Sequence, residues 1–254
     1  MKLIRQGEAK KLMHTKDQRI CLWLVPVFGS LFIFAFWNFK GFFPPMSPTM
    51  SAEAVAAFYR DNLGHIRSSM ILCNVIGVSL VPFYTVIVVQ MMRMLNASRV
   101  FAYSYLIAVV NGGTLFALAD LAWLNAAFRP DRDPQLTMLL NDLAWFAFIT
   151  PVGFVIVQNF CLAMAVYLDK GLRPVFPRWV AHFNIVTAVL IAPSAFALMY
   201  KTGPLAWDGA ISFWLHISTY GVYVAVMFFV VRAAIRQQDE EALAAQSSWQ
   251  ERLA

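Results

Sequence analysis

The chain has 254 residues, of which 60% are hydrophobic and 13% are charged, and its formal net charge is +6. Soluble globular domains carry about 25% charged residues, so this composition indicates a protein whose surroundings are partly lipid. The basic residues lie between apolar blocks and form no basic segment interleaved with aromatic residues. That pattern argues against nucleic acid as a partner and leaves the lipid bilayer as the expected one.

Six apolar segments are long enough to cross a bilayer as α-helices, because a hydrocarbon core about 30 Å thick needs about 20 helical residues. They predict an all-α, polytopic membrane helix bundle with an uncleaved first span. The expected spans are 20–43, 68–92, 101–128, 139–168, 178–200 and 209–231. We therefore expect the chain to consist of a basic cytoplasmic tail (1–19), a six-helix transmembrane domain (20–231) and a second cytoplasmic tail (232–254).

The distribution of basic residues predicts the orientation of the bundle. Most of the 20 Lys and Arg residues fall on the side that holds both chain ends. By the positive-inside rule that side is cytoplasmic, so both termini are expected in the cytoplasm. The arrangement is typical of a protein integral to the cytoplasmic (inner) membrane of a bacterium.

Three segments outside the predicted spans have helical signals. Ser51 is a suitable N-cap for a short helix that reaches Asp61 and lies along the outer interface. Asp133 is a suitable N-cap, and Pro134 a suitable first-turn residue, for a helix that continues into the fourth span. The charged, Ala-rich tail after Gln237 is expected to be a frayed continuation of the sixth span.

Asp120 is the acidic residue that lies well inside a predicted span. Ionisable residues within membrane spans are costly and often functional, so Asp120 is the first candidate for a site. Asn74, Trp145 and His216 have a similar computed depth in the outer half of the membrane. The predicted substrate-binding residues are these four and three that share a helix face with them, namely Asn74, Asp120, Trp123, Trp145, His216, Thr219 and Tyr220.

Two interpretations of these polar residues remain open. In the first, they line an outer pocket in which Asp120 and His216 form a titratable pair. In the second, they are interhelical hydrogen bonds that only hold the helices together. A second polar set lies near the cytoplasmic side and is interpreted as interfacial anchors and helix contacts; it comprises Gln158, Asn159, His182 and Asn184.

The sequence predicts neither a metal site nor a cofactor. The four histidines have no ligand-type spacing, and the three cysteines lie in separate apolar blocks without a CxxC motif. Glycine-rich phosphate loops and the GxSxG motif of hydrolases are also absent from the sequence.

Matching prolines in the two halves suggest a 3+3 inverted repeat. Pro26 in the first span corresponds to Pro151 in the fourth, and Pro82 in the second corresponds to Pro193 in the fifth. Inverted repeats with helix breaks in matching places are typical of transporters. The alternative is chance, since proline is common in membrane helices.

Three functional classes are consistent with these features. The leading one is a small carrier or binding protein for an apolar or weakly polar small molecule, held in the outer pocket around Asp120 and His216. The second is an accessory or structural subunit, whose partners are other membrane subunits. The third is an intramembrane enzyme acting on a lipid, terpenoid or quinone-like substrate, with Asp120 or His216 as general acid or base.

Overall fold

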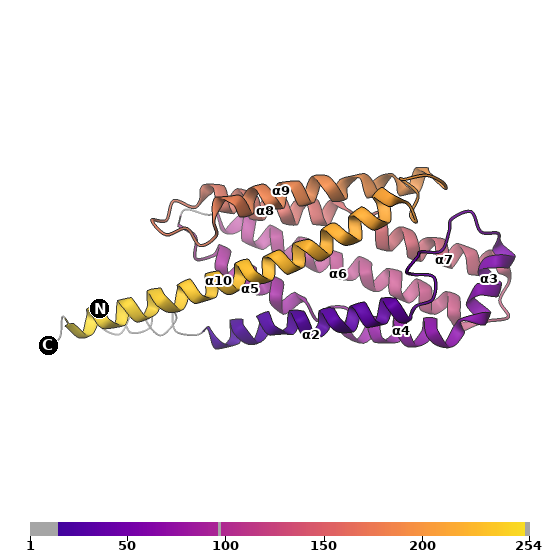
Figure 1. Ribbon diagram of the computed structural model, residues 1–254, viewed down its shortest axis with the longest axis horizontal. Coiled ribbons are helices and arrows are strands. Elements are labelled where there is room, and N and C mark those ends of the chain that lie inside the picture. The colour runs from indigo at the N-terminus through magenta and orange to yellow at the C-terminus, as the bar shows by residue number, and fades with distance from the viewer. Residues whose placement is uncertain (1–14, 96–97, 252–254) are drawn as a thin grey trace.

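The computed structural model describes residues 15–95 and 98–251, and it contains helices but no strands over these residues. The helices pack side by side in an elongated bundle (Figure 1). Six helical segments are long and apolar enough to cross a membrane: Lys16–Asn38, Leu63–Met91, Arg99–Phe128, Pro134–Leu168, Arg178–Met199 and Ala210–Gln250. The predictions of an all-helical fold and of about six membrane-spanning helices are confirmed.

Two of the six spans are single α-helices and four are composite. The first span is α2 (Lys16–Asn38), and the third is α6 (Arg99–Phe128). The second span consists of α4 (Leu63–Ile76) and α5 (Val81–Met91), and the fourth of α7 (Pro134–Ile149) and α8 (Gly153–Leu168). The fifth consists of α9 (Arg178–Ile191) and the 3-10 helix η1 (Ala192–Met199), and the sixth of the π-helix η2 (Ala210–Leu215) and α10 (His216–Glu251).

The two ends of the bundle differ. The short helix α3 (Ala52–Asp61) covers one end, here called the α3 end, and α10 projects beyond the other helices at the opposite end, here called the tail end (Figure 1). The amide of Ala54 donates to Ser51 Oγ at 3.2 Å, and the amide of Gln135 donates to Asp133 Oδ1 at 2.8 Å. Both N-caps predicted from the sequence are therefore confirmed.

Helix α3 packs onto α7 through its apolar face. Val55 and Tyr59 on that face are buried, and the Tyr59 hydroxyl donates to Asn141 Oδ1 at 3.1 Å. Burial, followed by the nearby Asp142 carboxylate, raises the pKa of Tyr59 well above its ordinary value. The neutral phenol thus holds α3 against the end of the bundle.

The flanks of the bundle are apolar. Large hydrophobic side chains such as Ile33, Trp37 and Val75 are exposed, with 69%, 75% and 76% of their surface accessible. Exposed apolar surface on this scale marks a contact with a nonaqueous environment. It supports a lipid bilayer as the surroundings of the six spans.

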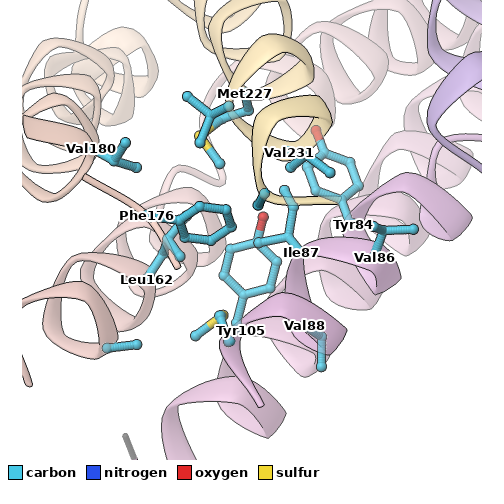
Figure 2. Packing of buried hydrophobic residues seen from close by; sticks show 14 of the residues in the cluster. Tyr84, Val86, Ile87, Val88, Tyr105, Leu162, Phe176, Val180, Met227 and Val231 are labelled. Carbon is cyan, nitrogen blue, oxygen red and sulfur yellow. The ribbon is translucent and has the colours of Figure 1, made fainter. Parts of the chain in front are cut away.

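The buried apolar residues form two main clusters, one toward each end. Figure 2 shows part of the cluster toward the tail end, which includes Leu162, Met227 and Val231. The cluster toward the α3 end is dominated by aromatic rings around Phe42. We call this ring group the aromatic cluster; its members are Phe36, Phe39, Phe42, Trp123, Trp145, Phe148 and Phe213.

The tail-end part of α10 is held by polar side chains from α2 and α5. Gln90 Nε2 donates to Gln18 Oε1 at 2.6 Å and to Gln238 Oε1 at 2.9 Å, and all three residues are buried. Arg93 pairs with Glu241 at 2.7 Å. The predicted continuation of the sixth span into the tail is confirmed, but it is a regular helix as far as Glu251 and not a frayed one.

Candidate functional site

Four of the six spans depart from regular α-helical structure, the second and fourth within the span and the fifth and sixth in their segments toward the α3 end. In the second span, residues 77–80 form a turn between α4 and α5, directly before Pro82. In the fourth span, Pro151 lies between α7 and α8. The fifth span changes to a 3-10 helix just before Pro193, and the sixth begins as a π-helix. Irregular backbone at membrane depth is tolerated where protein surrounds it or where it lines a polar cavity.

Tyr220 lies where these four interruptions approach one another. Its hydroxyl is 2.6 Å from the hydroxyl of Tyr84, which is one helical turn beyond the interruption of the second span. Its ring packs against the small cluster that contains Val152, from the interruption of the fourth span. Ala195, in the 3-10 helix of the fifth span, packs against the same cluster. Tyr220 thus joins segments from all four composite spans.

Polar side chains continue from Tyr220 toward the α3 end. Ser194 Oγ donates to the Ser212 carbonyl at 3.2 Å, and His216 Nδ1 is 3.0 Å from the same Ser194 oxygen. Because Ser194 has a single hydroxyl proton, His216 Nδ1 acts as the donor to it. The other imidazole nitrogen, Nε2, is then an acceptor.

Polar side chains also continue from Tyr220 toward the tail end. The hydroxyls of Tyr105 and Tyr223 are 3.1 Å apart, and Gln158 Nε2 donates to the Tyr223 hydroxyl at 3.2 Å. Tyr223, like Tyr220, belongs to α10. We call the whole set the polar column; it comprises Ser194, Ser212, His216, Tyr220, Tyr84, Tyr223, Tyr105 and Gln158.

An apolar layer closes the polar column toward the tail end. Along α10, Tyr223 is followed by the buried residues Met227 and Val231 before the next buried amide, Gln238. Figure 2 shows these apolar side chains facing Tyr84 and Tyr105. The layer is formed by Ile87, Leu162, Phe176, Met227 and Val231.

Asp120 lies outside the polar column, at the seam between α4 and α6. Its side chain is fully buried, and Asn74 on α4 is its polar neighbour. Among the residues that the structure describes, no donor satisfies either carboxylate oxygen with hydrogen-bond geometry. The Asn74 side chain is nonetheless close enough to act on this carboxyl group as a hydrogen-bond donor. Ionisable residues inside membrane spans are costly and are often functional, so Asp120 stays a candidate residue.

Trp123 and Trp145 belong to the aromatic cluster. Their rings meet edge to face with centroids 5.2 Å apart, and both side chains are fully buried. Within the described part of the chain neither indole N–H has an acceptor, whereas the indole of Trp207 donates to the Met46 carbonyl at 2.7 Å.

The residues predicted to share one pocket therefore fall into three neighbourhoods. His216 and Tyr220 lie on the polar column, and Thr219 is a half-buried residue of the same helix. Asn74 and Asp120 lie at the α4–α6 seam, and the two tryptophans lie in the aromatic cluster. His216 has Ser194 as its polar partner, and the carboxylate of Asp120 is not among the contacts that His216 makes in the described residues.

Some residues of the column were not singled out from the sequence. Tyr84, Tyr105, Ser194 and Ser212 lie in apolar runs, where a single hydroxyl gives little signal. Gln158 was interpreted as a helix contact, and its hydrogen bond to Tyr223 of α10 is such a contact, but its place among the other hydroxyls of the column was not predicted. The position of Tyr84 just after Pro82 was the available signal, because helix breaks often adjoin binding sites in membrane proteins.

Surface depressions of about 260 Å³ lie near the tail end. One lies between α2 and α5, and another lies between α2 and α10. Neither is lined by Asp120 or His216. In the described ranges, no group of three or more His, Cys, Asp and Glu side chains is arranged to hold a metal ion.

Comparisons of the chain with protein-family models, curated proteins and solved structures found no match.

Proposed function

We propose that the protein is a small membrane carrier, or binding protein, for an apolar or weakly polar small molecule. The observation that carries the proposal is the convergence of four interrupted spans around Tyr220. Interrupted helices build the substrate sites of many transporters, because their freed backbone groups and movable segments lie at membrane depth.

The chemistry of the column fits a weakly polar ligand. Its groups are hydroxyls, an amide and the neutral imidazole of His216, and the surrounding side chains are apolar or aromatic. Small-molecule sites commonly combine an apolar wall with a few placed polar groups. In this proposal the column binds the molecule and Asp120 supplies the titratable or cation-binding group.

The described conformation corresponds to a closed state of such a carrier. The apolar layer around Met227 seals the column toward the tail end, and the aromatic cluster fills the α3 end. With the tail end in the cytoplasm, as the basic residues indicate, each seal would open in turn to one side of the membrane.

Cysteine accessibility tests this proposal without knowledge of the substrate. In a background lacking Cys21, Cys73 and Cys161, Ser194→Cys places a thiol in the buried column with little change of volume. A charged, membrane-impermeant thiosulfonate is then applied to either side of sealed vesicles of known orientation. In a carrier the thiol reacts from both sides, because the column opens alternately to each.

Two matched variants control the experiment. Val222→Cys on α10 tests the lipid-facing surface, and Ala144→Cys tests a fully buried position in the α3-end core outside the column. Both should react slowly from either side, since the charged reagent enters neither lipid nor a static core. A Ser194→Cys protein that reacts as slowly as Ala144→Cys from both sides contradicts the carrier proposal.

A second candidate function is that of a subunit in a larger membrane complex. The observation that favours it is the projection of α10 beyond the bundle, where Leu243 and Trp249 expose 66% and 39% of their surface (Figure 1). Exposed apolar side chains on a projecting helix suit contact with another protein. This candidate predicts no labelling of Ser194→Cys and a native mass, after mild extraction, well above that of the single chain.

A further inference from the structure

Three glutamine side chains from three helices meet at the tail end. Gln90 of α5 donates from Nε2 to Gln18 of α2 at 2.6 Å and to Gln238 of α10 at 2.9 Å. Gln18 Nε2 also donates to Gln238 Oε1, at 3.3 Å. All three side chains are buried, so the amides satisfy one another across the helix boundaries. The network therefore joins α2, α5 and α10 at one point.

Two ion pairs beside these amides also cross from one helix to another. Arg93, just beyond the end of α5, pairs with Glu241 at 2.7 Å and donates to the Ala234 carbonyl at 3.3 Å. Arg19 of α2 pairs with Asp239. Both carboxylates belong to α10, so each ion pair attaches this helix to a different neighbour. We call the three glutamines and these two ion pairs the tail-end clasp.

Polar contacts dominate the attachment of α10 at this level. Between residues 236 and 250, Gln238 is the buried residue of the helix, and the others are at least partly exposed. Surface depressions of about 260 Å³ adjoin the clasp, one beside Gln18 and the other beside Asp239. Water can replace the partners of amides and charged groups when helices separate. The end of α10 can therefore leave α2 and α5 without exposing a large apolar surface.

Helix α10 connects the clasp to the polar column. Tyr220 and Tyr223 of the column lie on this helix, followed by Met227 and Val231 of the apolar layer and then by Gln238. Helices α5 and α10 both contribute side chains to the layer. Separation of α10 from α5 would therefore open the column toward the tail end, and the clasp opposes that separation.

We propose that the tail-end clasp is a latch that keeps the polar column closed toward the tail end, and that its release lets α10 move away from α2 and α5. The inference rests on the proposed function, for which it names the contacts that control one of the two seals. Contacts that exist in one conformation and not in another set the populations of the two. Loss of a clasp contact should therefore favour the conformation open toward the tail end.

The test measures labelling of Ser194→Cys from each side of sealed vesicles, in the full chain without its native cysteines. Glu241→Gln removes the ion pair with Arg93. It should raise the labelling rate from the tail-end side several-fold and lower the rate from the α3-end side. Glu240→Gln is the matched control, because Glu240 pairs with Arg236 of the same helix, and its rates should equal those of the parent. Equal rates in Glu241→Gln and Glu240→Gln overturn the proposal.

A latch is distinguished from a contact that merely stabilises the fold by the direction of the change. Gln90→Leu removes the central amide without changing the charge, and it should shift the two rates as Glu241→Gln does. General loosening would instead raise labelling from both sides and would also raise it at Ala144→Cys. Such a uniform rise overturns the proposal. If Gln90→Leu does not fold, Glu241→Gln decides, since the Glu241 side chain is 36% exposed and its loss leaves no cavity in the core.

A second measurement does not depend on the column. Spin labels at Ile20→Cys of α2 and Ala244→Cys of α10, both at exposed positions, report the distance between the two helices by pulsed electron paramagnetic resonance. Glu241→Gln should add a population at longer distances that Glu240→Gln lacks.

The two proposals can therefore fail separately. Labelling of Ser194→Cys from neither side removes the carrier, whereas a longer distance in Glu241→Gln would still show that the clasp holds α10 to α2. Labelling from both sides, with rates and distances unchanged in Glu241→Gln, retains the carrier and overturns the latch.

Discussion

The hydroxyl oxygens of Tyr84 and Tyr220 are 2.6 Å apart, and they connect the second and sixth spans at the level where both have just resumed α-helical structure. The contact therefore ties two interrupted segments together. A hydrogen bond between such segments stabilises one relative arrangement of them, and its loss should favour others.

Tyr84→Phe and Tyr220→Phe should each destabilise the protein by about 1 kcal/mol, because each leaves the partner hydroxyl buried and unpaired. The double variant should lose less than the sum of the two. Interhelical hydrogen bonds in membrane proteins give coupling energies of about 0.6 kcal/mol on average and up to about 1.7 kcal/mol. Reversible unfolding in mixed micelles measures all four proteins of the cycle, and strictly additive losses would show that the two hydroxyls do not interact.

Gly112→Ala should destabilise the crossing of α6 and α8. A Cβ atom at this position would lie 2.4 Å from Cε2 of Phe154, a ring that is packed between the two helices. Overpacking of this kind costs about 1–3 kcal/mol. Thermal unfolding monitored by circular dichroism measures the loss.

Gly113→Ala is the matched control for that experiment. Its Cβ would have Val78 Cγ1 as its nearest neighbour, at an ordinary contact distance of 3.7 Å. This variant should remain within about 0.5 kcal/mol of the parent protein. The Gly112→Ala loss should shrink when Phe154→Leu is added, and a loss that persists in full would mean that the steric contact is not its cause.

Phe42→Ala should cost about 3 kcal/mol, the lower end of the range for this substitution in protein cores. The Phe42 ring is fully buried and lies within 5.6 Å of the ring of Trp145, centroid to centroid. Trp37→Ala is the comparison, because that larger ring faces the surroundings with 75% of its surface exposed. The prediction fails if the two variants unfold at the same temperature.

Docking of α3 should weaken at alkaline pH. The folded-state pKa of Tyr59 is raised, so the stability that its neutral form provides is complete below the ordinary tyrosine pKa of about 10 and declines as the pH rises above it. The measurement compares the unfolding temperatures of the parent protein and of Tyr59→Phe from pH 8 to pH 11. The difference between the two proteins isolates the stabilisation that the Tyr59 hydroxyl provides. The difference between the two proteins should change only above about pH 10, and a difference that is constant with pH would contradict the assignment.

The spans and helix caps could be predicted from the sequence because they depend on local properties. Apolar length identifies the spans, and Ser51 and Asp133 precede segments whose first amides need acceptors.

Proline in the sequence was an incomplete guide to where the spans are interrupted. Pro26 lies inside the continuous helix α2, with Ser30 Oγ donating to the Pro26 carbonyl, whereas Pro82, Pro151 and Pro193 adjoin irregular segments.

The set of residues that meet in the candidate site could not be predicted, because the depth of a residue along its helix does not determine which other residues lie beside it. Asp120 and His216 have similar computed depths, but Asp120 lies against Asn74 of the second span while His216 contacts Ser194 of the fifth span. The regular structure of the α10 extension, which was expected to be frayed, could not be predicted for a related reason. Its sequence is that of an exposed tail, and the side chains that hold it, Gln18, Gln90 and Arg93, come from other spans.

The position of Phe42 has a consequence for biosynthesis. Phe42 follows the first span, but its ring contacts Trp123 of the third span, Trp145 and Phe148 of the fourth, and Phe213 of the sixth. As the chain leaves the ribosome, the loop that carries Phe42 is made early and most of its partners are made late. The α3 end can reach its final packing only after the last span has entered the membrane, so a chain truncated before residue 213 leaves this core incomplete.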